Sequence, residues 1–323
     1  MELQSDHLAS FCYNFYLRTL RYQRKYKFIK RSANKIWEKS LAIFRDKTVI
    51  TSIHRRKIYA NYGYTYPIIC RKFYTYNFPL VELAYQTSRL KGSPISIVDI
   101  GAAIGDTVLL LEASCPNMIG KYYCVDGDDE FFKYLGENLS HKENVVLLKT
   151  FLSSTVGKAK SLVKIHPGTA SAQGSEDIST TTLDQLAEEG LIGQFDLLKI
   201  DVDGFDGLVL LGAKVTLMNK KPTVIFEWHP VLCAETGNNW TDHFSALNDC
   251  GYNRFIFFDN YGNFGHFMNG IDNQAVSSLA QILELKKHTH AEYFDVIAIH
   301  DACPIKSEDL AAFDFAKTHK HPY

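Results

Sequence analysis

The chain has 323 residues, of which 46% are hydrophobic and 13% aromatic, so it can bury a large core without disulfides or metals to stabilise it. No apolar run approaches the ~18 to 20 residues that cross a bilayer. The seven scattered cysteines form no C-x-x-C pair, which argues against a disulfide framework and a zinc knuckle. We therefore expect a cytoplasmic protein that is free in solution or peripheral to a membrane.

The net charge of -1 hides an uneven distribution of charge along the chain. Residues 1–92 hold 18 Lys or Arg and 5 Asp or Glu, whereas the remaining residues hold 17 and 31. From His7 to about Arg45 the pattern is helical, and basic residues alternate with aromatic ones that include Phe11, Phe15, Tyr22 and Phe28.

Residues 1–45 could lie on an anionic membrane surface or contact nucleic acid. Aromatic residues at helical spacing more often pack on the protein's own core, and packing is the interpretation that we favour. Nucleic acid is the least favoured partner, because no recognisable nucleic-acid-binding fold accompanies the charge.

Tyrosines are dense between residues 54 and 79, where two prolines favour an irregular segment or short strands over a single helix. Tyrosine together with arginine suits sugar binding by stacking and hydrogen bonding, and it suits ordinary burial equally well. A helix is expected over Leu80–Leu90, before the loop Lys91-Gly92-Ser93-Pro94. We therefore expect a basic, mainly helical N-terminal extension (1–92), a main domain (93–300) and a C-terminal tail (301–323).

The stretch Ile95–Val108 reads ISIVDIGAAIGDTV and predicts a buried strand, a loop of small residues and the start of a helix. Gly101, Ala103 and Gly105 would let a ligand approach the backbone of this loop, next to the free N–H groups at the helix start.

The next predicted strand, Lys121–Val125, ends at Asp126. This acid follows the glycine loop at about the ~20-residue spacing at which a carboxylate accepts both hydroxyls of a ribose. The alternative is a solvated turn that caps the helix Glu130–Leu139. We favour the ribose contact.

Strands and helices alternate after this unit. Five further strands are expected at Val145–Leu148, Asp196–Ile200, Thr223–Phe226, Arg254–Phe258 and Asp295–Ile299. Helices are expected at Glu130–Leu139, Leu183–Glu189, Phe205–Leu217, Asp242–Cys250 and Asn273–Leu285. The alternation predicts a seven-stranded, doubly wound, Rossmann-like α/β sheet, with ligand bound outside the carboxyl ends of the strands.

Specific motifs accompany these elements between about residues 93 and 300. They are VDIGAAIGD at Val98–Asp106, Asp126 after the second strand, FFKYLGENL at Phe131–Leu139, STTTLDQL at Ser179–Leu186, LLKIDVDGFDGLVLLGA at Leu197–Ala213 and PTVIFEWHP at Pro222–Pro230. In these motifs the chain resembles the FkbM-type branch of the class I S-adenosylmethionine-dependent methyltransferases. The resemblance implies that S-adenosyl-L-methionine binds against Asp99, Gly101, Ala103, Gly105, Asp106, Asp126, Gly127 and Ser153.

Methyl transfer to an alcohol needs an aligned donor and acceptor and removal of the hydroxyl proton. The implied fold places four side chains beside the reacting methyl group, namely Asp201, Asp203, Glu227 and His229. We expect His229 to act as base and Asp201 to orient the acceptor, in preference to a divalent metal held by the three acids. The competing structural roles are a helix cap for Asp201, an ion pair with Lys199 for Glu227 and a turn position for His229.

The sequence thus predicts an S-adenosylmethionine-dependent O-methyltransferase that acts on a sugar hydroxyl in a cell-surface glycan or a glycosylated metabolite. No metal site is expected, because His288-Thr289-His290 has one metal-like spacing and no third ligand. Two other functions stay open. One is an NAD(P)-dependent oxidoreductase on a similar fold, and the other is a non-catalytic adaptor with a degenerate methyltransferase domain.

Overall fold

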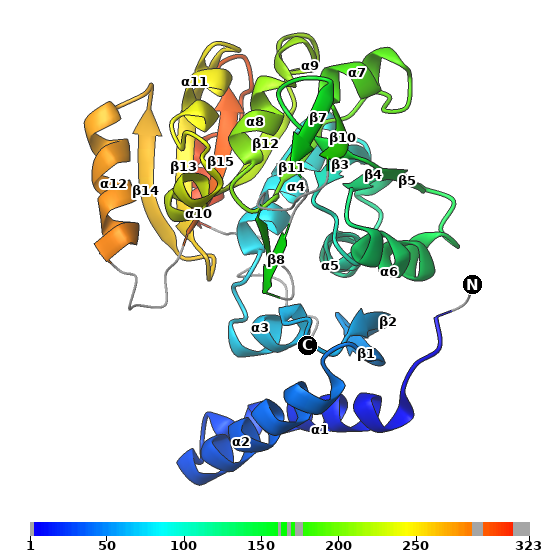
Figure 1. Cartoon of the computed structure of the whole chain (residues 1–323). Helices are drawn as coiled ribbons and strands as arrows, with labels where there is room; N and C mark the ends of the chain where they lie inside the picture. Colours follow the sequence, from blue (N-terminus) through cyan, green and yellow to red (C-terminus); the bar gives the residue numbers. More distant parts are fainter. Residues whose placement is uncertain (1–2, 161–162, 167–168, 172–176, 286–292, 313–323) are drawn as a thin grey trace.

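A computed structural model describes residues 3–160, 163–166, 169–171, 177–285 and 293–312. Its centre is an eight-stranded sheet in the order β14-β13-β15-β12-β11-β3-β4-β5 (Figure 1). The strands are β3 (Ile95–Ile100), β4 (Ile119–Asp126), β5 (Val145–Lys149), β11 (Leu197–Ile200), β12 (Thr223–Trp228), β13 (Tyr252–Asp259), β14 (Phe264–Asn269) and β15 (Phe294–His300). The first five run parallel, and β15 lies antiparallel between β12 and β13. The predicted doubly wound α/β sheet is confirmed.

The strand count differs from the prediction by one, because β14 pairs antiparallel with β13 and adds an edge strand. Its residues Phe264, Gly265 and Asn269 are exposed and Met268 is buried, so it lacks the buried apolar run of the inner strands. An exposed edge strand with an interior glycine gives only a weak sequence signal.

Both faces of the sheet are buried, which explains the continuous apolar runs of its strands. Alternate residues of one strand enter different cores, as Leu197 and Leu198 of β11 do. Helices α4 (Phe78–Lys91), α5 (Asp106–Ser114) and α6 (Asp129–Leu139) pack in the first core. The second core contains α7 (Leu183–Glu188), α8 (Asp206–Leu211), α9 (Lys214–Lys220), α11 (Asp242–Asn248) and α12 (Asn273–Leu285).

The predicted helix Phe205–Leu217 is in fact two helices, α8 and α9, which are separated at Gly212. A Cβ at Gly212 would lie 2.2 Å from the carbonyl oxygen of Ser153. The chain can approach Ser153 this closely only where the residue has no side chain, so the helix breaks at the contact.

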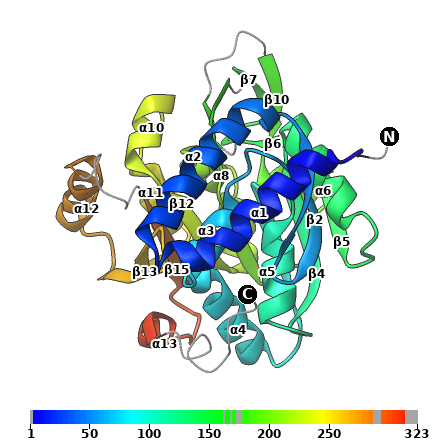
Figure 2. The same cartoon turned by 90° about the horizontal axis from the view of Figure 1, so that it is seen from below.

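The N-terminal segment contains α1 (His7–Gln23), α2 (Lys27–Phe44), the hairpin β1 (Thr48–Ile53) and β2 (Arg56–Asn61), and α3 (Tyr66–Lys72). The helical pattern expected from His7 to about Arg45 thus forms two helices. Trp37 of α2 stacks on Tyr62 with ring centroids 5.1 Å apart, and the Tyr13 hydroxyl of α1 donates to the Tyr64 carbonyl over 2.6 Å. Figures 1 and 2 show α1 and α2 together along the lower side of the molecule.

The described part is completed by smaller elements that the sequence patterns do not predict. These are β6 (Phe151–Leu152), β7 (Gly157–Lys160), β8 (Val163–His166), β9 (Thr169–Ser171), β10 (Asp177–Thr181), α10 (Pro230–Thr236) and α13 (Ser307–Ala312). The segment His288-Thr289-His290 lies outside the described residues. No helix within the described ranges is long and apolar enough to cross a membrane.

Candidate active site

Two cavities lie next to each other at the carboxyl ends of the parallel strands. The first, the Asp126 chamber, has walls that include Asp126, Phe151, Ser153, Thr180 and Phe205. The second, the Tyr64 chamber, has walls that include Tyr64, Tyr66, Tyr76, Asp106, Glu227, His229 and Tyr293. Both are lined by Gly101, Ala103, Phe131, Asp201 and Asp203, so the two chambers meet at these residues.

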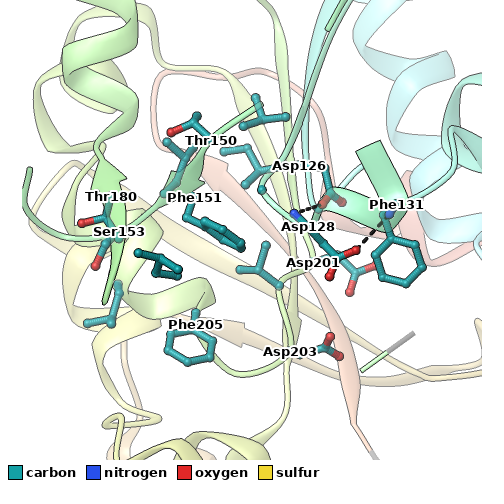
Figure 3. Close-up of a pocket in the computed structure, with 18 of the residues that line it drawn as sticks. Asp126, Asp128, Phe131, Thr150, Phe151, Ser153, Thr180, Asp201, Asp203 and Phe205 are labelled. Carbon is teal, nitrogen blue, oxygen red and sulfur yellow. Dashed lines mark hydrogen bonds between the residues drawn. The ribbon is translucent and has the colours of Figure 1, made fainter. Parts of the chain in front are cut away.

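The side chains of the Asp126 chamber come from several loops and from the small β6–β10 sheet. Figure 3 shows Asp126 and Asp201 on one side, Ser153 and Thr180 on the other, and the ring of Phe151 between them. A mostly apolar pocket with a few polar groups at its ends is typical of a site for a small molecule.

Asp126 is buried at the end of β4 and is held in place by two backbone donors. Its carboxylate oxygens accept from the Ala103 N–H at 2.8 Å and from the Asp128 N–H at 2.9 Å. Burial raises the pKa of Asp126 to about 7, and the two backbone hydrogen bonds act in the opposite direction. Each oxygen accepts one of these bonds, so the carboxylate retains acceptor capacity for two ligand hydroxyls.

The solvated-turn alternative for this segment is wrong for Asp126, because the residue is buried. The cap of α6 is instead Asp128, which accepts from the N–H groups of Glu130 and Phe131. The two acids therefore have different roles: Asp126 lines the chamber, and Asp128 caps α6.

The glycines of the site are required by packing of the protein on itself. A Cβ at Gly101 would lie 1.9 Å from the Asp201 carbonyl oxygen, and one at Gly105 would lie 2.6 Å from Leu139. A Cβ at Gly127 would lie 2.4 Å from the Phe151 ring. Gly101 still lines both chambers, so a ligand could approach its backbone as predicted, whereas Gly105 lines neither chamber and only packs against the protein.

An ion-pair cluster centred on the buried Lys199 lies at the junction of the two chambers. The Lys199 ammonium is 3.1 Å from the Asp99 carboxylate and 3.2 Å from that of Asp201. Burial by itself would lower the pKa of Lys199, but the nearby carboxylates outweigh it and raise that pKa well above its ordinary value. Lys199 is therefore a fixed positive charge, and its partners are Asp99 and Asp201 rather than the predicted alternative, Glu227.

Asp99 and Asp106 lie apart from the Asp126 chamber, although the family resemblance assigns both to the cofactor. Asp99 is fully buried in β3 and lines neither chamber, so its structural role is to pair with Lys199. Asp106 begins α5 and lines the Tyr64 chamber, where it accepts from the Tyr64 hydroxyl at 2.8 Å. Burial raises the pKa of Asp106 to about 6.

The hydrogen bond of His229 favours a role other than the predicted base. His229 caps α10, and its Nδ1 accepts from the Leu232 N–H at 3.2 Å. Burial lowers its pKa to about 4, so the ring is neutral at pH 7. A neutral ring whose Nδ1 accepts must carry its proton on Nε2, and Nε2 is then a donor rather than a base.

The remaining predicted acids line one or both chambers. Glu227 of β12 is buried in the wall of the Tyr64 chamber, and burial, with Asp201 and Asp203 nearby, raises its pKa well above the ordinary value. Asp203 lines both chambers and has a left-handed backbone with φ of 51°. Asp201 does not cap α8, which begins at Asp206 after Phe205.

Sequence patterns do not single out several residues of the two chambers. Phe151 comes from β6, a strand of two residues that is too short to give a periodic signal. Thr180 of β10 lies in the STTTLDQL motif, which gave it no role at the site. Tyr64, Tyr66 and Tyr76 belong to the tyrosine-dense segment, where sugar binding and burial are equally compatible with the composition. The density of tyrosines is therefore the one sequence feature that points to these residues, and the structure places the three tyrosines in the wall of the Tyr64 chamber.

Comparisons with known proteins find one domain family and several solved structures. Residues 99–254 match the sequence model of the methyltransferase FkbM domain. No curated protein matches the chain. Among solved structures, the chain is similar to methyltransferase FkbM from Methylobacillus flagellatus KT, with 14% identity, a TM-score of 0.36 and coverage of 49% of this chain. The chain spans only 36% of that protein, about a third of its length.

Two further solved structures illustrate the same level of similarity. Precorrin-6y C5,15-methyltransferase from Geobacter metallireducens GS-15 shares 13% identity, with 68% of this chain and 88% of that one covered and a TM-score of 0.35. The plantazolicin methyltransferase BamL, solved with a triazolic desmethylPZN analog and SAH, shares 9% identity, with 70% and 85% covered and a TM-score of 0.36.

The mostly parallel sheet, in which β15 and the edge strand β14 run antiparallel, and the chambers at its carboxyl edge define a Rossmann-like fold of the class I methyltransferase type. Within that class, residues 99–254, just under half of the chain, match the FkbM methyltransferase domain.

Proposed function

We propose that the protein is an S-adenosylmethionine-dependent O-methyltransferase whose acceptor is a sugar hydroxyl in a glycan or a glycosylated metabolite. The observation that carries the proposal is the junction of the two chambers at Gly101, Asp201 and Asp203. A methyl donor in one chamber and an acceptor in the other would meet there, and positioning is a large part of what such an enzyme contributes.

The residues of the Asp126 chamber fit the cofactor. Asp126 can accept from both ribose hydroxyls, and Gly127 and Ser153 lie on the same chamber wall beside Phe151, whose ring offers a flat apolar surface for an adenine. When bound, the cofactor supplies a methyl group that is already activated for transfer. The protein then has to hold the acceptor and manage its proton.

Asp201 is the residue that we assign to the acceptor proton. It lines both chambers, and its ion pair with Lys199 holds one carboxylate oxygen in place. Asp201 would accept the proton of the acceptor hydroxyl, while the bond broken in exchange would be the sulfur–methyl bond of the cofactor. Lys199 stays protonated and keeps the carboxylate in position.

His229 and Glu227 act as hydrogen-bond donors to the acceptor in this assignment. Neutral His229 presents an Nε2 proton, and the raised pKa of Glu227 favours its neutral, donating form. The sugar assignment is supported by four tyrosines in the same chamber, because tyrosine provides both a flat apolar ring and a hydroxyl: Tyr64, Tyr66, Tyr76 and Tyr293.

Metal assistance would require Asp201, Asp203 and Glu227 to share one cation. Asp201 is already paired with Lys199 at 3.2 Å, and a buried ammonium beside the site opposes the binding of a second cation. Among the described residues, no group of three or more His, Cys, Asp or Glu side chains is arranged to hold a metal ion.

Equilibrium binding separates the proposal from its two competitors. We expect S-adenosylhomocysteine to bind by isothermal titration calorimetry and NADH not to bind, and we expect methyl transfer from labelled S-adenosylmethionine to a panel of oligosaccharides. NADH binding without S-adenosylhomocysteine binding would indicate an oxidoreductase. Binding of neither would indicate the adaptor. Methylation of amines but not of hydroxyl compounds would reject O-methylation.

A further inference from the structure

The outward side of α1 carries a stripe of exposed apolar residues. The helix buries Ala9, Tyr13 and Leu17, with others, on its inner side. On the opposite side Leu8, Phe11, Phe15 and Tyr22 are exposed, and their spacing along the sequence places them in one line along the helix. A surface helix normally has polar residues in such positions. The favoured expectation, that these aromatic residues pack on the core, is therefore wrong for Phe11, which is 66% exposed.

Helix α2 also leaves large apolar side chains exposed. Its buried residues are Ala33 and Ser40, whereas Phe28, Ile36 and Ile43 are exposed, Phe28 to 69%. The two helices lie together in front of the rest of the chain when the molecule is viewed from below (Figure 2). We call the exposed residues of both helices and of their connecting turn the outer face: Leu8, Phe11, Phe15, Tyr22, Tyr26, Phe28, Ile36 and Ile43.

Positive charge surrounds the outer face. Residues 1–45 contain ten Lys or Arg and three Asp or Glu. Arg21 lies over the Tyr22 ring at 4.6 Å and Lys25 over the Tyr26 ring at 5.9 Å, so cations and aromatic rings are interleaved. Within the described residues, none of the cations in this segment forms an ion pair with a carboxylate. Their charge is thus available to an external anion.

We propose that the outer face binds an anionic lipid surface, with its aromatic and aliphatic side chains in the headgroup region and its lysines and arginines on the lipid phosphates. An interfacial helix combines these two features: an apolar face and a basic border. Nucleic acid would use the cations but would leave the Leu and Ile residues without a role. A second copy of this chain would bring two positively charged faces together, which like-charge repulsion opposes.

The contact between α1 and α3 determines which part of the protein would lie near the lipid. Helix α1 packs against α3, and Tyr66 and Ile69 of α3 line the Tyr64 chamber. Lipid binding by the outer face would therefore hold that chamber close to the bilayer. The binding itself does not depend on the reaction that the chambers perform.

Vesicle flotation tests the proposal on the full chain. We would use vesicles of phosphatidylcholine alone and of phosphatidylcholine mixed about 3:1 with phosphatidylserine, at low and high salt. The charge variant is Lys25→Glu with Lys30→Glu, and the apolar variant is Phe11→Ser with Phe28→Ser. Matched controls change exposed residues on other elements: Lys133→Glu with Lys306→Glu, and Val215→Ser with Leu285→Ser.

We expect the wild type to float with the anionic vesicles only, with binding that weakens steeply as salt rises. Each basic residue near such a surface contributes about 1 kcal/mol, so the charge variant should lose at least about 30-fold in partition coefficient. The apolar variant should lose at least about tenfold. Both control variants should bind like the wild type, and all variants should melt near the wild-type temperature.

Four outcomes would overturn the proposal. The first is no flotation of the wild type, and the second is flotation that the charge and apolar variants leave unchanged. The third is self-association that is lost in the apolar variant without any vesicle binding, which would identify a second copy as the occupant. The fourth is salt-dependent binding to a homopolymeric RNA without vesicle binding, which would assign the cations to nucleic acid.

Discussion

The Lys199 ammonium lies 3.2 Å from the Asp201 carboxylate and thereby couples the buried centre of the sheet to the junction of the two chambers. Asp201 is about half exposed on its side-chain atoms, whereas Lys199 is almost wholly buried. Asp201 is thus the solvent-facing member of the pair, and Lys199 is the buried one. Asp99, 3.1 Å from the same ammonium and fully buried, supplies the second counter-charge that keeps Lys199 stable inside the sheet.

Lys199→Met should destabilise the fold, because it leaves Asp99 as an unpaired buried carboxylate. Loss of one partner of a buried ion pair typically costs about 3 to 5 kcal/mol. The double variant Lys199→Met with Asp99→Asn should regain part of the lost unfolding free energy, since both buried charges are then removed. Urea denaturation measures all four corners of the cycle. Strictly additive effects of the two substitutions would show that the pair is not coupled.

Asp201→Asn should impair chemistry while leaving the cofactor bound. The amide cannot take a proton, so turnover should fall by about 10²-fold or more, a typical value for a proton-transfer group. Affinity for S-adenosylhomocysteine should stay near that of the wild type, because Asp126 and not Asp201 is assigned to the ribose. Single-turnover methyl transfer and calorimetry give the two readouts. Near-normal turnover would remove Asp201 from its role.

Asp126→Ala should weaken cofactor binding. Two ribose hydroxyls would lose a charged acceptor, which corresponds to about 2 to 3 kcal/mol, or on the order of 30- to 150-fold in dissociation constant. Asp128→Ala is a useful comparison, since it removes the neighbouring acid and the cap of α6 without removing the ribose acceptor. Calorimetric titration with S-adenosylhomocysteine should separate the two variants. Unchanged affinity in folded Asp126→Ala would contradict the assignment.

The sequence predicts the inner part of this molecule better than its outer part, for physical reasons. Buried parallel strands such as Ile95–Ile100 form apolar runs, and Asp126 follows its strand directly, so both can be recognised from nearby residues alone. Phe151 reaches the chamber through a two-residue strand, and β14 is an exposed edge. Their positions depend on distant parts of the chain, which local patterns do not encode.

The role of His229 shows a second limit of prediction from the sequence. His229 has the residue type and the position that a general base needs, and the structure does place it in the Tyr64 chamber. Its hydrogen bond from the Leu232 N–H decides which ring nitrogen carries the proton. That contact depends on the start of α10, a helix of seven residues that the sequence patterns do not predict.

His229→Asn should retain more activity than His229→Ala. Asparagine can accept from the Leu232 N–H through its side-chain oxygen and still offer an N–H donor, whereas alanine removes both and also costs about 1 kcal/mol of helix capping. Because the pKa of His229 is lowered to about 4, the pH dependence of kcat/KM should show no inflection from this residue between pH 5 and 8. Loss of an inflection near pH 6.5 in His229→Asn would instead make it a titrating base.

Asp206→Asn should make the stability of the protein less sensitive to pH. Asp206 is fully buried, one of its oxygens has no hydrogen-bond partner among the described residues, and burial raises its pKa to about 7. A folded-state pKa above the unfolded one, which is about 4, means that the folded protein binds the extra proton between those values. The stability that this proton contributes is complete below pH 4 and is lost as pH rises through 7.

Asparagine remains neutral at every pH, so the variant does not lose the unfolding free energy that the wild type loses as pH rises. The difference in unfolding free energy between Asp206→Asn and the wild type should therefore shift in favour of the variant from pH 4 to pH 8, by at most about 4 kcal/mol. Urea denaturation at several pH values measures this shift. Asp46→Asn, at an exposed position, is the control and should show a pH-independent difference. A flat difference for Asp206→Asn as well would mean that Asp206 is ionised in the folded protein well below pH 7.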